Sequence, residues 1–584
     1  DSSSVSIAYT ATGQRVSVLD SRGLTAFVYN ERDRLLQRTD PDGATISYTY
    51  DEAGNRTSVT VPSGTNTYAF DALNRLSTVT DPDGGVTSYT YDAVGNRASI
   101  TYPNGTKATY TYDALNRLAL IENQRSDNSI ISSYSYTLGP AGNRTRVQEH
   151  TGRIVDYIYD ALYRLTQENI TDLTLGDRII TYSYNPVGNR LSKGDTVAGP
   201  IAYTYDENDR LLTENGNTYS YDNNGNTTSK TEGSDVTTYR YDYENRLIGA
   251  QTPASLVNYT YDADGIRVSA SVDGVVLNYL VDKNIAYAQV LEEKDGASAL
   301  VANYVYGDDL IRMDRNGVDS FYHYDGHGNT RQLTDDGENT TDTYIYDAFG
   351  TLLNKTGATE NNYLYTGEQN DMNIGFYYLR ARYYNTETGR FITTDPFWGN
   401  TFDPLSLHKY IYAHENPVNN IDPSGTTILY IDLLASTYLR TLLSKIVLYR
   451  IKFITSLANI MENRIAILER PFYLFSIEYP DLMAYLLPEF VIHENLAIWY
   501  LGKRCVYGFF GIGTWFWDDI DGEVRPVTEN FGQLKEFKFI SSEETKDLME
   551  EIKGEIAHGP YIGVYNPFNY TCRSWAREKY DSVD

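Results

Sequence analysis

Short segments with alternating residues, each followed by turn-forming residues, recur along the first 350 residues of the chain. In YTYDEAGNR, which begins at Tyr48, two tyrosines flank Thr49, so both rings lie on one face of an extended strand. Asp51 and the Gly-Asn pair after it are residues that reverse a chain. Arg56 then opens RTSVTV, whose alternation is typical of a returning strand. The pattern predicts a β-hairpin.

The hairpin pattern repeats with a period of about 20 residues, a length typical of stacked supersecondary units. Clear copies begin at Tyr48, Tyr68, Tyr89, Tyr110, Tyr157 and Tyr203, and weaker copies at Tyr134, Tyr182, Tyr221, Tyr239 and Tyr259. Tyrosine-rich alternation also occurs in β-helices, propellers and wall-binding repeats. The chain is therefore predicted to be mainly β, built as an array of hairpins.

The combination of YD, GNR and NRL in each copy resembles the RHS/YD-repeat family over residues 5–425. The resemblance implies a long sheet that spirals into a hollow shell, expected here over residues 1–343. The stretch YLYTGEQNDMNIGFYYLRARYYNTETGRFITTDP resembles the RHS-associated core, which implies a plug over residues 344–425. Within it, FYYLRARYY is predicted to be one strand, NTETG a turn and RFITTDP another strand.

Composition and charge narrow the class of protein. The 54 tyrosines against 19 phenylalanines favour sheets, and only two cysteines are present, so sheet packing must hold the shell together. The net charge of −29 disfavours nucleic-acid binding by the chain as a whole and suits a secreted or surface-displayed protein. Because the sequence opens inside a repeat without an initiator Met, we expect a C-terminal fragment whose export signal, if any, lies upstream.

Two Asp-Pro aspartates are the candidate catalytic residues of the core segment: Asp395, in DPFWG, and Asp422, in IDPSG. The resemblance implies that such a pair cuts the chain after the second motif. Two facing carboxylates could share a proton, one activating water and the other protonating the leaving nitrogen. Asp-Pro is also an ordinary turn pair. Thr426 stands where the family usually has Leu, and extra residues separate the motifs, so an uncut plug is the alternative.

The composition changes after Gly425, where a smaller α+β domain is expected over residues 426–584. Residues 427–470 have leucine, isoleucine and aromatic residues at helical spacing, and residues 471–584 are predicted to be α+β. Charged residues interrupt every apolar window of residues 427–455, so a buried helix is favoured over a membrane-spanning one. The domain has 16 basic and 22 acidic residues, which disfavours a nuclease.

A cysteine and a histidine are the candidate catalytic pair of this domain. Cys572 begins a predicted helix, whose dipole favours a thiolate, and His493 begins a predicted strand. The order and the NYTCRSWARE stretch resemble circularly permuted, papain-like NlpC hydrolases. A buried structural cysteine and a Cys505–Cys572 disulfide are alternatives, and His558 is a weaker candidate base.

The resemblance to the RHS/YD-repeat family implies a secreted or surface polymorphic toxin that acts in interbacterial competition. Its shell would enclose a C-terminal cysteine hydrolase and release it by aspartyl self-cleavage. An immunity protein, secretion machinery and a target-cell surface are the expected partners, and nucleic acid is not. The alternatives are an adhesion shell without catalysis and membrane disruption through residues 427–455. Neither paired metal ligands nor a glycine-rich phosphate loop occurs in the sequence, so no metal or cofactor is expected.

Overall fold

The computed structural model describes residues 4–400, 403–430, 472–476, 496–499, 506–510 and 514–518. The chain divides into two units, Asp1–Ile465 and Ala466–Asp584, which are described separately.

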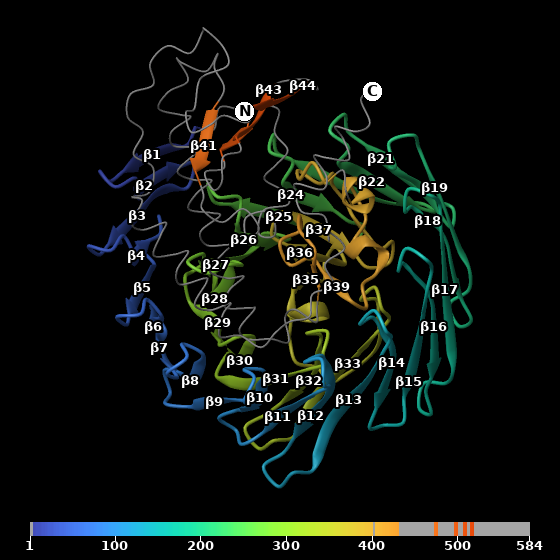
Figure 1. Ribbon diagram of the computed structural model, residues 1–584, viewed down its shortest axis with the longest axis horizontal. Coiled ribbons are helices and arrows are strands. Elements are labelled where there is room, and N and C mark those ends of the chain that lie inside the picture. The colour runs from blue at the N-terminus through green and yellow to red at the C-terminus, as the bar shows by residue number, and fades with distance from the viewer. Residues whose placement is uncertain are drawn as a thin grey trace. The chain divides into compact units, whose positions relative to one another are not determined.

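The first unit is built on one antiparallel sheet of 34 strands, in which each strand pairs with the next along the chain (Figure 1). Its strands are β1 (Ser6–Tyr9), β2 (Arg15–Asp20), β3 (Gly23–Tyr29), β4 (Leu35–Thr39), β5 (Thr45–Tyr50), β6 (Arg56–Val61), β7 (Gly64–Phe70), β8 (Leu76–Thr80), β9 (Val86–Tyr91), β10 (Arg97–Thr101), β11 (Lys107–Tyr112), β12 (Leu118–Gln124), β13 (Ile130–Leu138), β14 (Arg144–Glu149), β15 (Ile154–Tyr159), β16 (Leu165–Thr171), β17 (Arg178–Tyr184), β18 (Arg190–Asp195), β19 (Ile201–Tyr205), β20 (Leu211–Glu214), β21 (Asn217–Tyr221), β22 (Thr227–Glu232), β23 (Asp235–Tyr241), β24 (Leu247–Gln251), β25 (Leu256–Tyr261), β26 (Arg267–Val272), β27 (Val275–Asp282), β28 (Gln289–Asp295), β29 (Leu300–Tyr306), β30 (Leu310–Arg315), β31 (Val318–Tyr324), β32 (Thr330–Thr334), β33 (Thr340–Tyr346) and β34 (Leu352–Thr356). The predicted hairpin array is confirmed.

Each YD turn is held by its aspartate. In the turn between β5 and β6, the Asp51 N–H donates to the Asn55 carbonyl, and Asp51 Oδ1 accepts the Asn55 N–H at 2.8 Å. Gly54 has a φ of +93°, which glycine adopts without strain. In the NRL copies an asparagine takes this left-handed position, as Asn74 does with a φ of +58°. The turn residues inferred from the sequence therefore form the turns.

The tyrosines of each Tyr-x-Tyr pair have separate roles. In β5 the first ring, Tyr48, is buried, and the second, Tyr50, donates its hydroxyl to the Leu35 carbonyl of the preceding repeat at 2.8 Å. The same bond to the preceding repeat is made by Tyr91, Tyr112, Tyr159, Tyr184, Tyr205, Tyr221, Tyr241, Tyr261, Tyr324 and Tyr346. Phenylalanine would leave a partly buried carbonyl without this partner, which explains the preference for tyrosine.

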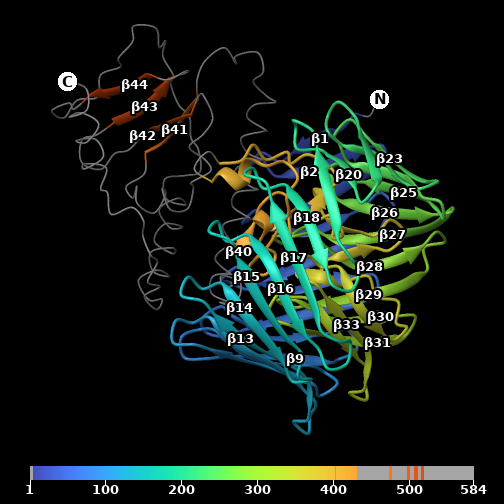
Figure 2. The same cartoon turned by 90° about the vertical axis from the view of Figure 1, so that its right-hand side faces the viewer.

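The sheet winds back beside itself to make a shell. Asp282, at the end of β27, accepts the Tyr48 hydroxyl at 2.7 Å and pairs with Arg56 at 2.5 Å. Further on, Arg312 pairs with Asp81 at 3.2 Å, and Lys193 pairs with Asp347 at 2.9 Å. Strands β27–β34 therefore run beside strands that precede them by about half the length of the sheet, as the blue and green strands do in Figures 1 and 2.

The shell sheet extends past the predicted boundary at residue 343, because β33 and β34 continue it to Thr356. The core segment then forms a four-stranded sheet from β35 (Gln369–Asp371), β36 (Phe376–Leu379), β37 (Arg382–Asn385) and β38 (Arg390–Phe391). Three 3-10 helices, η1 (Tyr365–Gly367), η2 (Pro404–Leu407) and η3 (Ala413–Glu415), and the hairpin of β39 (Asn420–Ile421) with β40 (Leu429–Tyr430) complete it.

The core segment contacts the shell from within its curve (Figure 1). The Tyr259 hydroxyl donates to Asp371, and the Thr227 N–H donates to the Ile392 carbonyl at 2.9 Å. The prediction of one strand for FYYLRARYY is wrong, because Arg380 has a φ of +61° and turns the chain between β36 and β37. Both strands are buried throughout, so alternation does not distinguish a strand from a tight hairpin here.

Little of the C-terminal domain belongs to the described residues. In the second unit, β41 (Phe472–Ser476) pairs in parallel with β42 (Leu496–Trp499), and β43 (Val506–Phe510) pairs antiparallel with β44 (Thr514–Asp518). The predicted helix over residues 427–470 begins incorrectly, since β40 is extended, and its remainder lies outside the described residues. Within the part of the chain that the structure describes, no helix is long and apolar enough to cross a membrane.

Candidate functional site

The two candidate aspartates of the core segment meet at one arginine. Asp395 Oδ2 lies 2.7 Å from Arg382 Nη2, and Asp422 Oδ2 lies 3.4 Å from the same nitrogen. Arg382 and Asp422 each have 3% of their side chain exposed, so both charges are largely removed from water. The carboxylates are thus joined through a guanidinium, which differs from the directly facing pair expected from the sequence.

The core sheet and its loops position these three residues. Arg382 opens β37, and its guanidinium lies over the Phe391 ring of β38 at 3.5 Å. Asp395 follows β38, with its N–H bonded to the Lys409 carbonyl at 2.9 Å and its Oδ1 accepting the Phe397 N–H at 2.8 Å. Asp422 directly follows β39, and its Oδ1 accepts the Thr426 and Thr427 N–H groups, each at 3.0 Å. Backbone hydrogen bonds therefore fix both carboxylates against the arginine.

The Gly425–Thr426 peptide bond lies between the arginine and one aspartate. Arg382 Nε donates to the Gly425 carbonyl oxygen, and the Thr426 N–H donates to Asp422 Oδ1 at 3.0 Å. Gly425 has a φ of +73°, and a Cβ there would lie 2.5 Å from the Leu379 carbonyl oxygen. Glycine is required by both the conformation and the space. A donor therefore contacts the carbonyl of this bond, and a carboxylate contacts its nitrogen.

Burial sets the protonation of the site. Desolvation raises the pKa of Asp395 to about 6, although the Arg382 charge opposes the shift. Desolvation also raises the pKa of Asp422, against the Arg382 charge and three hydrogen-bond donors. Desolvation lowers the pKa of Arg382, which the two carboxylates oppose. One carboxyl that ionises near neutral pH beside another that retains its proton more readily than usual is an arrangement suited to acid–base chemistry.

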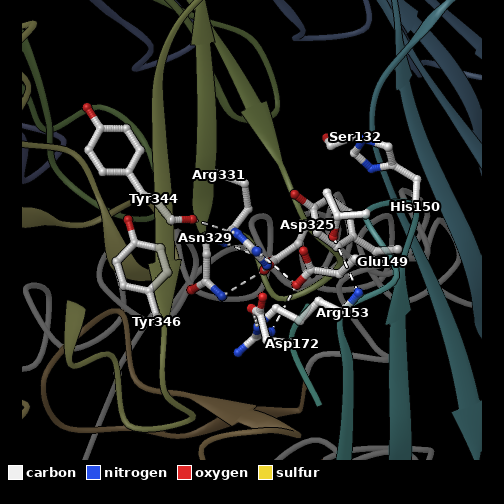
Figure 3. A network of polar contacts seen from close by, with 12 residues as sticks. Ser132, Glu149, His150, Arg153, Asp172, Asp325, Asn329, Arg331, Tyr344 and Tyr346 are labelled. Carbon is white, nitrogen blue, oxygen red and sulfur yellow. Dashed lines mark hydrogen bonds and ion pairs between the residues drawn. The ribbon is translucent and has the colours of Figure 1, made fainter. Parts of the chain in front are cut away.

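A second buried cluster of charges links the two sides of the shell and contains none of these residues (Figure 3). Arg331 pairs with Glu149 at 2.9 Å and with Asp325 at 3.1 Å, while Arg153 contacts Glu149 at 3.0 Å. The Arg331 Nε also donates to the Tyr344 carbonyl at 2.9 Å. Because these charges are paired across β14 and β32, we assign the cluster to holding the shell closed.

The structure brings two of the predicted site residues together, adds one that the sequence analysis did not identify, and does not describe the others. Asp395 and Asp422 are brought together, whereas Arg382 was missed, because it was interpreted as one residue of a continuous strand. Cys572, His493, Cys505 and His558 lie outside the described residues, so their roles remain predictions. Among the residues that the structure describes, no group of three or more His, Cys, Asp or Glu could hold a metal ion.

The fold defines a class of protein, an antiparallel YD-repeat shell with a core segment inside it. The family model for the teneurin YD-shell matches residues 142–418, and that for the RHS repeat matches residues 9–45, 29–65 and 70–107. Over these residues the chain belongs to the RHS/YD-repeat family, as the sequence predicted.

Individual relatives agree with this assignment. The tRNA3(Ser)-specific nuclease WapA of Bacillus spizizenii is 31% identical over 263 residues, and the tRNA nuclease WapA of Bacillus subtilis strain 168 is 30% identical over 263 residues. Each match covers 43% of this chain but only 9% of the relative's length. The crystal structure of TcdB2-TccC3-Cdc42 matches with a TM-score of 0.56 at 16% identity, over 75% of this chain and 25% of that one. The crystal structure of TcdB2-TccC3-TEV matches with a TM-score of 0.54 at 17% identity, over 70% of this chain and 24% of that one. The structures establish the shell fold.

Proposed function

We propose that this chain is the shell-bearing part of a secreted or surface-displayed RHS-type polymorphic toxin, and that it cuts itself between Gly425 and Thr426. The observation that carries the proposal is the placement of this peptide bond, with Arg382 on its carbonyl oxygen and Asp422 on its nitrogen. The cut would separate the shell from residues 426–584, the expected effector.

The chemistry is hydrolysis of one amide. Asp395, ionised near neutral pH, takes a proton from water, whose oxygen attacks the Gly425 carbonyl carbon. Arg382 stabilises the negative charge that develops on the carbonyl oxygen. Asp422 then gives its proton to the Thr426 nitrogen as the C–N bond breaks. The products are a Gly425 carboxylate and a Thr426 amine.

The presence of threonine at position 426 does not weaken the proposal. The contacts to the bond use the Gly425 carbonyl and the Thr426 N–H, which every residue except proline supplies. The Thr426 hydroxyl contacts Ser424 at 3.1 Å, on the same loop. The departure from the usual leucine therefore changes a side chain outside the acid–base set.

Intact mass spectrometry of the purified chain beside Asp422→Asn and Asp395→Asn tests the proposal. We expect the wild-type chain to yield fragments that end at Gly425 and begin at Thr426, and both variants to stay intact. Asp403→Asn is the control, because this aspartate also precedes a proline of the core segment but does not contact Arg382. An uncut wild-type chain, or variants cut as fast as it, would contradict the mechanism.

The released part is proposed to be a cysteine hydrolase that uses Cys572 and His493. The WapA relatives carry the name of tRNA nucleases, but each match covers only 9% of the relative. The excess of acidic over basic residues in residues 426–584 weighs against binding to a phosphate backbone. An immunity protein that blocks the hydrolase, and a secretion system that exports the chain, complete this proposal.

A further inference from the structure

Three consecutive carbonyl oxygens, which end with that of the Gly425–Thr426 bond itself, accept hydrogen bonds from three consecutive residues of one turn. Arg380 Nη1 donates to the Pro423 carbonyl, the Ala381 N–H donates to the Ser424 carbonyl at 3.2 Å, and Arg382 Nε donates to the Gly425 carbonyl. We call residues 380–382 the carbonyl clamp. Acceptors and donors run in the same order along the two segments, so the clamp fixes the register of the chain at the bond.

Arg380 is the member of the clamp that connects it to the shell. Its Nη1 also donates to Glu368 Oε2 at 2.8 Å, and its Nε and Nη2 donate to the Ala288 carbonyl at 3.3 and 3.2 Å. Ala288 lies in the connection between β27 and β28, so one guanidinium joins the shell wall, the core sheet and the loop to be cut. An arginine can satisfy several acceptors at once in this way, because its five N–H groups point in fixed directions.

Glu368 determines where this guanidinium lies. Its carboxylate is buried, and desolvation raises its pKa, against the charge of Arg380. Glu368 and Arg380 form a charged pair in which the carboxylate is buried and the guanidinium is only partly exposed, so each side chain restricts the other to one geometry. The pair with Glu368 therefore fixes the position of Arg380 Nη1, the atom that donates to the Pro423 carbonyl.

We propose that Arg380, oriented by Glu368, is a positioning residue for self-cleavage: it sets the Gly425–Thr426 bond against Arg382 and Asp422 without contacting the reacting atoms. This inference rests on the self-cleavage proposed above and identifies a residue on which its rate depends. The clamp acts through the backbone, because a carbonyl held two residues before the bond limits the dihedral angles that orient the Gly425 carbonyl. A misplacement of about 1 Å costs roughly 100-fold in rate.

The left-handed conformation of Arg380 permits a clean variant. Glycine adopts a φ of +61° without strain, so Arg380→Gly removes the guanidinium and keeps the turn. Arg380→Lys retains a charge but cannot reach Glu368, Pro423 and Ala288 together. Arg312→Gln is the control, since Arg312 pairs with Asp81 and Asp83 across the shell and with Asp319 on the neighbouring strand, and lies outside the clamp.

The experiment follows cleavage of newly translated full chain by pulse–chase between pH 5 and 8. We expect Arg380→Gly to be cut about 10- to 100-fold more slowly than wild type, Arg380→Lys to lie between them, and Arg312→Gln to match wild type. The acid midpoint should stay near that of wild type, because Asp395 is unchanged, and guanidinium ion in the buffer should restore part of the rate.

Specific outcomes would overturn the inference. Wild-type rates in Arg380→Gly, equal slowing in Arg312→Gln, or a shifted acid midpoint in Arg380→Gly would each show that the residue does not position the bond. Those results leave self-cleavage itself standing. A wild-type chain that is never cut would remove the proposed function, and the positioning role with it.

Discussion

Replacing Gly425 by alanine should slow self-cleavage without unfolding the shell. The new Cβ would lie 2.5 Å from the Leu379 carbonyl oxygen and 3.0 Å from the Arg382 nitrogen. Carbon–oxygen contacts ordinarily begin at about 3.3 Å, so the two segments must separate by roughly 0.8 Å. That movement draws the Gly425 carbonyl away from Arg382. A displacement of this size is expected to lower the rate by roughly 100-fold.

A glycine elsewhere in the core segment separates this effect from backbone strain. Gly375 has a φ of +74°, against +73° at Gly425, but a Cβ there would meet nothing within 4 Å. Gly375→Ala and Gly425→Ala therefore share a conformational cost of about 1 kcal/mol, and only the second disturbs the clamp. Densitometry of the uncut and cut chain over time after translation gives both rates. Equal rates for the two variants would refute the reasoning.

The remaining predictions concern pH, the repeats and the effector. Cleavage should accelerate as the pH rises from 5 through the pKa of Asp395, which is about 6, because this base becomes ionised over that interval, and a flat profile there would exclude it as the base. Tyr91→Phe removes the 2.6 Å hydrogen bond to the Leu76 carbonyl and should lower the free energy of unfolding in urea by about 1 kcal/mol. Tyr163→Phe is the control: its residue is 49% exposed, so the free energy of unfolding should not change. Cys572→Ala should abolish the toxicity of residues 426–584 expressed inside cells. Toxicity at the wild-type level would instead favour membrane disruption by residues 427–455. A liposome leakage assay detects such disruption.

The sequence predicts the repeats well because each hairpin is a local structure. Asp51, Gly54 and Asn55 make their turn with one another, so the residue types alone determine it. The winding of the shell depends on contacts such as Tyr48 with Asp282, which are 234 residues apart. No local pattern encodes such a pairing.

The candidate site shows the same division. Asp395 and Asp422 were identified through the resemblance to a family, and both lie at the site. Arg382 was missed because a buried hairpin and a buried strand have the same apolar pattern, and the left-handed turn at Arg380 has no residue type that marks it. The sequence did contain a signal for Arg382. An arginine among aromatic residues that are predicted to be buried needs a charged partner, and that need could have linked Arg382 to the two aspartates.

The agreement between strand order and chain order has a consequence for synthesis. Each strand can join the edge left by the strand before it, so the sheet can grow in step with the ribosome. The candidate site can form only after the shell strands have been synthesised, because Arg380 contacts Ala288 and Asp422 follows the last strand of the shell sheet. Cleavage at Gly425 would therefore act as a checkpoint, reporting that the whole wall has been translated and assembled.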